Sequence, residues 1–235
     1  MSKNSAIRVS DILTKIWENS AVRIEDGWKK ALNVDTLVEV FVGIEKVDRQ
    51  LTIIEKQYRD KNRGMGKLDK NIQEIRNFLN LPNLESPVHA YTKTYFKEAN
   101  IVAIGVAEAI FDDIDGENTI EQEKLDKMAS MVDELFKEIE NLEIDKKTKK
   151  LFLNVLHEMK MSLKFYEIDG VTTIEEAWIN LICRTKQLES NIATDGFTNK
   201  AKKLIVFVGE IIASTYIETG ISLLNESVKK VIESM

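Results

Sequence analysis

LDKMASMVDELFKEIENLEIDKKTKKLFLNVLHEMKMSLKFY, at residues 125–166, decides the fold class of this chain. Its apolar residues recur at spacings of three and four, first along one half of the stretch and then along the other. The two sets are Leu125, Met128, Val132, Leu135, Ile139 and Leu142, followed by Phe152, Leu156, Met159, Leu163 and Tyr166. Because the predicted connector between the two helices is only residues 143–145, the two sets predict an antiparallel helical hairpin.

The same periodicity continues outside the hairpin. It predicts further helices at Ser10–Glu18, Leu37–Tyr58, Lys67–Leu79 and Ile174–Leu188. Helix-start signals are Ser86 before Pro87, Thr119 before Gln122, and the capping-box pattern from Thr173 to Glu176. No strand pair with a hairpin turn and no internal repeat stands out.

Composition agrees with a helical fold. The chain has 235 residues, of which 43% are hydrophobic, and it contains only 2 Pro and 10 Gly. That length lies in the range of one domain. We therefore predict an all-α, single-domain multi-helix bundle over residues 10–235, with residues 1–9 disordered. The loop at residues 80–87 leaves two sub-lobes, 10–80 and 87–235, as a further prediction.

The most apolar segment is at the C-terminus, from Ala201 to Met235. It predicts a buried apolar C-terminal helix at the centre of the bundle. An alternative interpretation is a membrane-acting effector that inserts residues 204–224. Glu210 and Glu218 oppose it, because each would cost ~2 to 3 kcal/mol near the centre of a bilayer. A third interpretation is an exposed face that binds a partner.

Cysteine usage and charge restrict the compartment and the partners. Cys183 is the single cysteine, so no internal disulfide can form, and the N-terminus lacks the apolar core of a signal peptide. We expect a cytoplasmic protein with Cys183 as an inert core residue. The net charge of −6 argues against nucleic acid as a partner.

An acidic stretch before the predicted hairpin resembles a calcium-binding loop. Carboxylates stand at the first, third, fifth and ninth loop positions, in Asp113, Asp115, Glu117 and Glu121. Asn118 replaces the glycine of the sharp turn, and Lys124 stands where a bidentate Glu should close the site. These four carboxylates are the candidate metal ligands, and a Mg- or Ca-dependent helical hydrolase or sensor is the alternative function that they indicate.

No other pattern indicates chemistry. His89 and His157 lack the spacing of paired metal ligands, and neither is preceded by a Glu at the position that di-iron bundles need. The basic loop at residues 63–67 lacks the leading glycine and the strand of a phosphate loop. We predict no catalytic residue and no cofactor.

The stretch from Leu142 to Leu181 carries a resemblance. It contains Leu-Glu-Ile-Asp, then Leu-Phe-Leu, then SLKFYEIDG ending at Gly170, and then IEEAW ending at Trp178. This succession is similar to a block that recurs in an uncharacterised group of bacterial all-helical proteins with no known activity. The resemblance implies a bacterial helical protein. Its residues also have a physical role, because Gly170 can take a left-handed conformation that ends one helix before the next begins.

Charge is separated along the chain. Twelve acidic residues and three lysines lie between Asp112 and Glu143, whereas six lysines and one acid lie between Lys146 and Lys164. Either the two helices attract each other as neighbours, or they steer a partner that docks electrostatically. The leading prediction is a non-enzymatic, cytoplasmic helical protein-interaction module. Its partner would be another protein or a second copy, with neither nucleic acid nor a membrane expected, and a bacterial defence or toxin–antitoxin system is one context for it.

Overall fold

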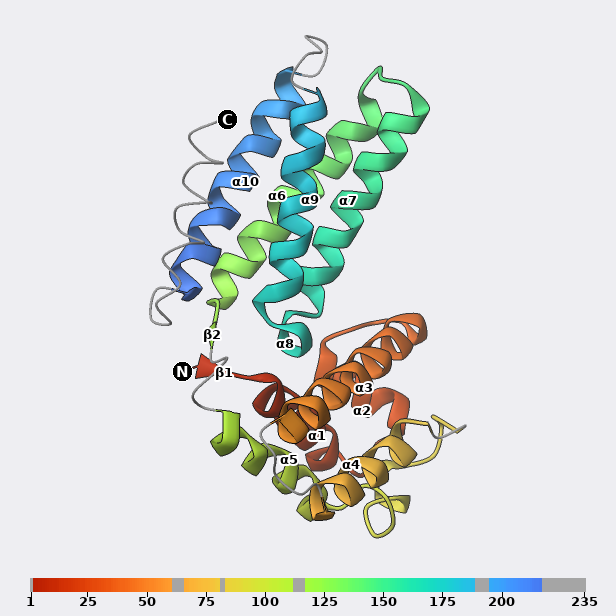
Figure 1. Cartoon of the computed structure of the whole chain (residues 1–235). Coiled ribbons are helices and arrows are strands. Elements are labelled where there is room, and N and C mark those ends of the chain that lie inside the picture. Colours follow the sequence, from red (N-terminus) through yellow and green to blue (C-terminus); the bar gives the residue numbers. More distant parts are fainter. Residues whose placement is uncertain (1, 61–65, 81–82, 112–116, 189–194, 217–235) are drawn as a thin grey trace. The chain divides into compact units, whose positions relative to one another are not determined.

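The computed structural model describes all residues except 1, 61–65, 81–82, 112–116, 189–194 and 217–235 (Figure 1). Nearly all regular structure in the described residues is α-helical, which confirms the all-α class. The chain divides into two compact units. The N-terminal unit comprises Lys3–Gly116 and Glu167–Asp169, and the C-terminal unit comprises Met1–Ser2, Glu117–Tyr166 and Gly170–Met235.

The described residues of the C-terminal unit form a four-helix bundle. Its helices are α6 (Gln122–Asn141), α7 (Lys146–Lys164), α9 (Val171–Leu188) and α10 (Asp195–Tyr216). Helix α6 packs against α7 and α10, and α9 packs against the same two helices. The antiparallel hairpin predicted from residues 125–166 is therefore confirmed as α6 and α7. Their periodic apolar residues lie in the core with those of α9 and α10.

Hydrogen bonds of buried aromatic side chains add to this packing. The indole Nε1 of Trp178 on α9 donates to the carbonyl oxygen of Ile205 on α10 at 2.7 Å. The hydroxyl of Tyr166, which follows α7, accepts a hydrogen bond from the backbone N–H of Ile120 at 2.7 Å. Each bond satisfies a buried polar group and joins segments distant in sequence.

Helix ends in this unit agree only in part with the predicted signals. Gly170 has φ 70, which confirms the positive backbone angle expected at the end of α8 (Tyr166–Asp169). The capping-box prediction at Thr173 is wrong, because α9 begins at Val171 and places Thr173 inside the helix. The start predicted at Thr119 is also wrong, since Glu121 occupies the N-cap position of α6.

The C-terminal helix α10 is one of the four bundle helices. It buries one face, which includes Leu204, Val208 and Ile212, whereas Glu210 is exposed. The prediction of a central helix buried on most sides is therefore not confirmed, since α10 packs mainly against α6 and α9. Residues 217–235 of the predicted segment lie outside the described residues.

The N-terminal unit is built around its first helix. It contains α1 (Ser5–Glu18), α2 (Ile24–Leu32), α3 (Leu37–Asp60), α4 (Gly66–Leu79), the 3-10 helix η1 (Val88–Ala90) and α5 (Glu98–Phe111). Helix α1 packs against α2, α3 and α5, and α5 also packs against α4. Between α4 and α5, the rings of Phe78 and Phe96 stack with centroids 4.0 Å apart.

Three boundaries differ from the sequence predictions. Residues 1–9 were expected to be disordered, but α1 begins at Ser5, and Ala6 and Val9 are fully buried. The helix expected after Pro87 is replaced by η1 and a turn. The predicted single domain, with a division near residues 80–87, is instead two units, because α5 packs on α1 and α4 and so belongs with the N-terminal helices.

Two short strands complete the described structure. Strand β1 (Ser2–Lys3) begins in the segment grouped with the C-terminal unit and pairs with β2 (Glu117–Asn118) of that unit. Among the described helices, none has the length and apolar character that crossing a membrane requires.

Candidate functional site: the outer face of helix α3

The four candidate metal ligands are only partly described. Asp113 and Asp115 lie outside the described residues. The backbone of Glu117 lies in strand β2. The side chain of Glu121 is exposed and forms an ion pair with Lys124 at 3.1 Å, within the first turn of α6. Lys124, which replaces the closing ligand of a calcium loop, thus neutralises one of the proposed ligands.

Among the described residues, no three His, Cys, Asp or Glu side chains lie together in a way that could hold a metal ion. The metal site at residues 112–121 stays a prediction, since only one of its four candidate ligands, Glu121, has a described side chain. His89 and His157 lie in different units, and both side chains are exposed.

The prediction for Cys183 is wrong. Its side chain is exposed, whereas its neighbours Leu181, Ile182 and Thr185 are buried. The helical period explains the difference, because the residue falls between the buried positions of α9 and points away from the core.

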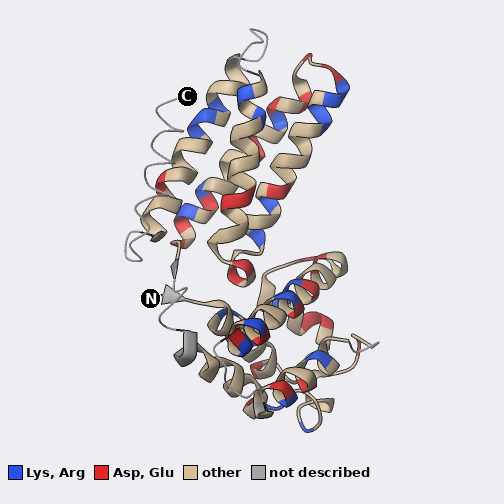
Figure 2. Ribbon diagram, viewed as in Figure 1, with Lys and Arg blue, Asp and Glu red and all other residues tan. Residues whose placement is uncertain are grey.

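Two ion pairs use charges of the acidic helix α6, one with α7 and one with α10. Lys160 of α7 donates to Asp133 of α6 at 2.7 Å, and Lys200 of α10 pairs with Glu138 of α6. Figure 2 shows residues of both signs along the helices of each unit. The interpretation of neighbouring helices that attract each other is therefore supported, and these charges are partly used within the bundle.

The start of α7 carries lysines next to two carboxylates. Lys146, Lys147 and Lys150 are exposed there, and none forms an ion pair among the described residues. Glu143 and Asp145 are exposed in the same turn. The two carboxylates offset part of the positive charge at this end of the hairpin.

Three exposed apolar side chains of the N-terminal unit gather at the start of α3. Leu37, Val38 and Phe41 have exposed fractions of 40%, 72% and 54%. They are spaced as i, i+1 and i+4, which places Val38 and Phe41 three residues apart on one face of the helix. Such a cluster is typical of a surface that contacts another protein.

The outer face continues toward the end of α3. Glu45 and Arg49 form an ion pair at 3.0 Å, with exposed side-chain fractions of 71% and 63%. Ile53 is 37% exposed, and Lys56 is exposed one turn further on. We call the residues Val38, Phe41, Glu45, Arg49, Ile53 and Lys56 the outer face of α3.

The inner face of α3 holds the helix in place. Val40, Val47, Leu51 and Ile54 are fully buried. These four residues follow the helical period on the side opposite to the outer face. The outer face is therefore presented by a helix whose position is determined by packing.

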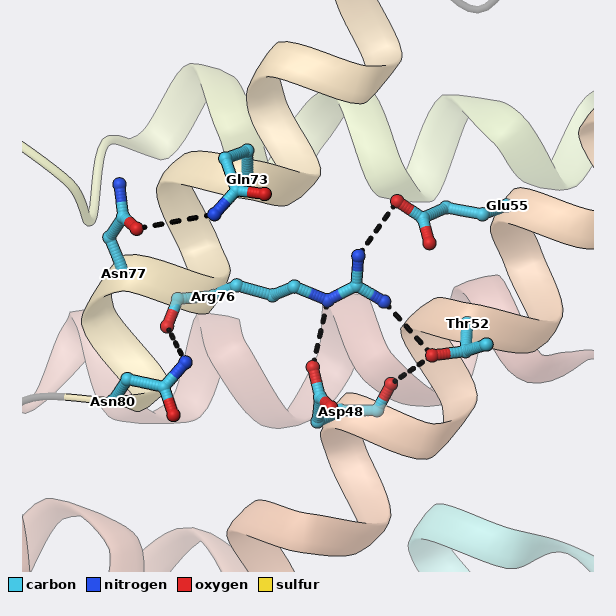
Figure 3. Close-up of polar contacts among 7 residues, drawn as sticks. All are labelled: Asp48, Thr52, Glu55, Gln73, Arg76, Asn77 and Asn80. Carbon is cyan, nitrogen blue, oxygen red and sulfur yellow. Dashed lines mark hydrogen bonds and ion pairs between the residues drawn. The ribbon is translucent and has the colours of Figure 1, made fainter.

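Polar contacts with α4 fasten the same helix (Figure 3). From α4, Arg76 donates from Nε to Asp48 at 2.8 Å, from Nη1 to Glu55 at 2.8 Å and from Nη2 to the Thr52 hydroxyl at 2.9 Å. Burial lowers the pKa of Arg76, but its hydrogen bonds with Asp48 and Glu55 outweigh burial and raise the pKa overall. The guanidinium stays charged and spans two turns of α3.

Sequence reasoning assigned part of the outer face to the core. The periodic set of the predicted helix at residues 37–58 included Leu37 and Phe41, which the structure leaves half-exposed. A signal for this was present, because apolar residues occupy five of the six positions from Leu37 to Val42. A run of that width covers more of the helix surface than one buried stripe needs.

A second, smaller exposed apolar pair lies on α5. Val102 and Val106 are 53% and 63% exposed and stand one turn apart. No charged residue with a described position lies between them on that face. The exposed Glu98 stands one turn before Val102 on the same helix, and no ion pair of that carboxylate is seen among the described residues.

Comparisons with known proteins give no relative from which a function could be inferred. No family model, no curated protein and no solved structure matches this chain. The resemblance of residues 142–181 to a bacterial helical group therefore stays a prediction.

Proposed function

We propose that this protein is a non-enzymatic protein-interaction module that binds its partner through the outer face of α3. The observation that carries the proposal is the exposure of Val38 and Phe41 on a helix that is otherwise well packed. Exposed apolar residues at helical spacing favour a partner that offers an apolar groove or a second helix.

Burial of the exposed apolar side chains on this face would contribute measurably to the free energy of binding. Full burial of a Val or Phe side chain contributes about 1.5 to 3 kcal/mol relative to exposure. Since Val38 and Phe41 are both more than half exposed, covering them would contribute about 2 to 3 kcal/mol to binding. That is a change of about thirtyfold or more in affinity.

The proposal places the protein in the cytoplasm. The single cysteine, Cys183, is exposed. An exposed thiol that has no disulfide partner in the chain is compatible with a reducing compartment.

Native mass spectrometry of the full chain, purified gently from cells that produce it, tests the proposal. We expect a complex with a protein partner or a second copy. The Val38→Ser, Phe41→Ser double variant should lose that complex while its melting temperature stays close to that of the unchanged protein, because neither side chain is buried.

The matched control is the Val102→Ser, Val106→Ser double variant, which removes similar exposed apolar area from α5. It should retain the complex. Loss of the complex only in the α5 variant would contradict the assignment to α3. A monomer that carries a bound metal or small molecule would overturn the interaction function and redirect attention to residues 112–121.

A further inference from the structure

We infer that the occupant of the outer face of α3 is the same face of a second copy, packed antiparallel about a two-fold axis at the level of Val47. This inference rests on the proposed function and names the partner. It is carried by the order of residues along the outer face, which is complementary to itself when reversed.

The outer face forms a continuous stripe. From Val38, the steps to Phe41, Glu45, Arg49 and Ile53 are three or four residues, as in helices that pair along their length. Val47 is fully buried on the inner face and stands midway along the stripe. In a two-fold antiparallel pair, each residue meets the one equally far beyond Val47 on the second copy.

The charges of Glu45 and Arg49 favour the antiparallel pair over a parallel one. Glu45 and Arg49 lie two residues before and two residues after Val47, so each Glu45 faces the Arg49 of the other copy, and the contact occurs twice. Their side chains are exposed and already within ion-pair distance of each other in one chain. A parallel pair would instead place Glu45 against Glu45 and Arg49 against Arg49, which like-charge repulsion disfavours.

Apolar contacts flank the charges. Phe41 and Ile53 lie six residues on either side of Val47, so the exposed ring of one copy meets the exposed Ile53 of the other. Val38 and Lys56, nine residues from Val47, meet in the same way, and the Lys56 stem can cover Val38 while its ammonium group stays in water. From the two-fold axis outward, the contacts on both sides are thus first ionic, then apolar, and finally between an apolar side chain and a lysine stem.

The α5 surface does not offer such a match. Val102 and Val106 provide apolar area, but no exposed ion pair among the described residues of that helix would fix an orientation. Of the two exposed apolar surfaces, the one on α3 is therefore the more complementary to itself.

The dimer should be weak. The stripe from Val38 to Lys56 covers about 27 Å of helix at ~1.5 Å per residue, and an α-helix is about 10 Å wide. One helix face of that size is smaller than the ~800 Å² per partner of a standard interface. We therefore expect a dissociation constant of about 1 to 10 μM, and a fast exchange between monomer and dimer.

Analytical ultracentrifugation of the full chain over a concentration series tests the inference. We expect reversible dimer formation by the unchanged protein. Glu45→Arg and Arg49→Glu should each weaken the dimer at least about tenfold, because each places like charges opposite one another. The Glu45→Arg, Arg49→Glu double variant should restore it, since the swap rebuilds both ion pairs across the axis.

The control is Asp26→Arg, which makes the same charge change in the exposed Arg23–Asp26 pair of α2. It should dimerise like the unchanged protein. Thermal melts of all variants confirm that the changes act on association, because both side chains of the Glu45–Arg49 pair are exposed. Higher salt should weaken the dimer of the unchanged protein and of the double variant alike.

Two results would overturn the inference. One is an unchanged protein that stays monomeric up to about 100 μM, a concentration at least about tenfold above the expected dissociation constant. The other is a folded double variant that stays as weak as the single variants. In either case, loss of a different co-purified partner from the Val38→Ser, Phe41→Ser variant would still support the broader interaction function.

Discussion

The Arg76 Nε atom on α4 lies 2.8 Å from the Asp48 Oδ1 atom on α3. With Glu55, this pair fastens the helix that presents the outer face, and the Arg76 and Glu55 side chains are only 21% and 17% exposed. The contact thus links the packing of the N-terminal unit to its candidate binding surface.

Replacing Arg76 with Ala should destabilise the N-terminal unit. The change leaves the largely buried Glu55 carboxylate without its cation, and we expect the free energy of unfolding to fall by about 1 to 3 kcal/mol. Arg59→Ala is the matched control, because Arg59 also connects α3 with α4 but pairs with Asp69 at 3.7 Å through exposed side chains. Urea unfolding followed by circular dichroism measures both. An equal loss in the two variants would contradict the assigned role of Arg76.

Trp178→Phe should destabilise the C-terminal bundle by about 1 to 3 kcal/mol, because it removes both a buried hydrogen bond to Ile205 and part of the packed ring. Trp17→Phe offers a contrast. The Nε1 atom of Trp17 is buried and has no hydrogen-bond partner in the described structure, so its removal relieves an unsatisfied donor. Thermal unfolding should show a clearly smaller loss for Trp17→Phe, and the reverse order would contradict this account.

Gly105 marks a close approach of α5 to α1. A Cβ atom at this position would lie 2.9 Å from the Ser10 Oγ atom and 3.5 Å from the Ser10 Cβ atom. Gly105→Ala should therefore lose much of the ~1 kcal/mol that alanine normally gains over glycine in a helix. Adding Ser10→Ala removes the clashing oxygen, so the double variant should be about 1 to 2 kcal/mol more stable than Gly105→Ala alone. Strictly additive effects in urea unfolding would argue against the contact.

The stability that Asp145 gives to the start of α7 should depend on pH. Its carboxylate accepts hydrogen bonds from the backbone N–H groups of Lys147 and Thr148 at 3.1 and 3.0 Å. Interactions with Thr148, followed by those with Lys147, lower the pKa of Asp145 below its ordinary value of 3.8. The folded state therefore gains stability above the ordinary pKa and loses that gain as the pH falls through the lowered pKa.

Asp145→Ala tests this dependence. The variant should melt at a lower temperature than the unchanged protein at neutral pH, and the gap should narrow as the pH falls below the pKa of the carboxyl. Asp145→Asn, which keeps a capping oxygen without the charge, should show a gap that changes less with pH. A gap for Asp145→Ala that is constant across the acidic range would contradict the capping role of the ionised side chain.

Much of the helical content could be predicted from sequence. Leu125 to Tyr166 repeats apolar residues at a clear helical spacing, and the structure confirms both helices and the turn between them. Start and stop signals were less reliable. Gly170 was identified correctly, whereas Thr119 and Thr173 have the sequence of helix caps but do not act as caps.

The sequence by itself determined the all-α class and the α6–α7 hairpin, because periodic apolar residues and a three-residue link are local properties of the chain. Only the tertiary structure decided that α5 joins α1 and α4, and that the chain divides into two units. It also decided which apolar residues of α3 are buried. Val40 and Phe41 are apolar neighbours in sequence, yet Val40 is fully buried and Phe41 is 54% exposed. Burial depends on which faces meet another element, and that is a property of the packed chain rather than of any segment.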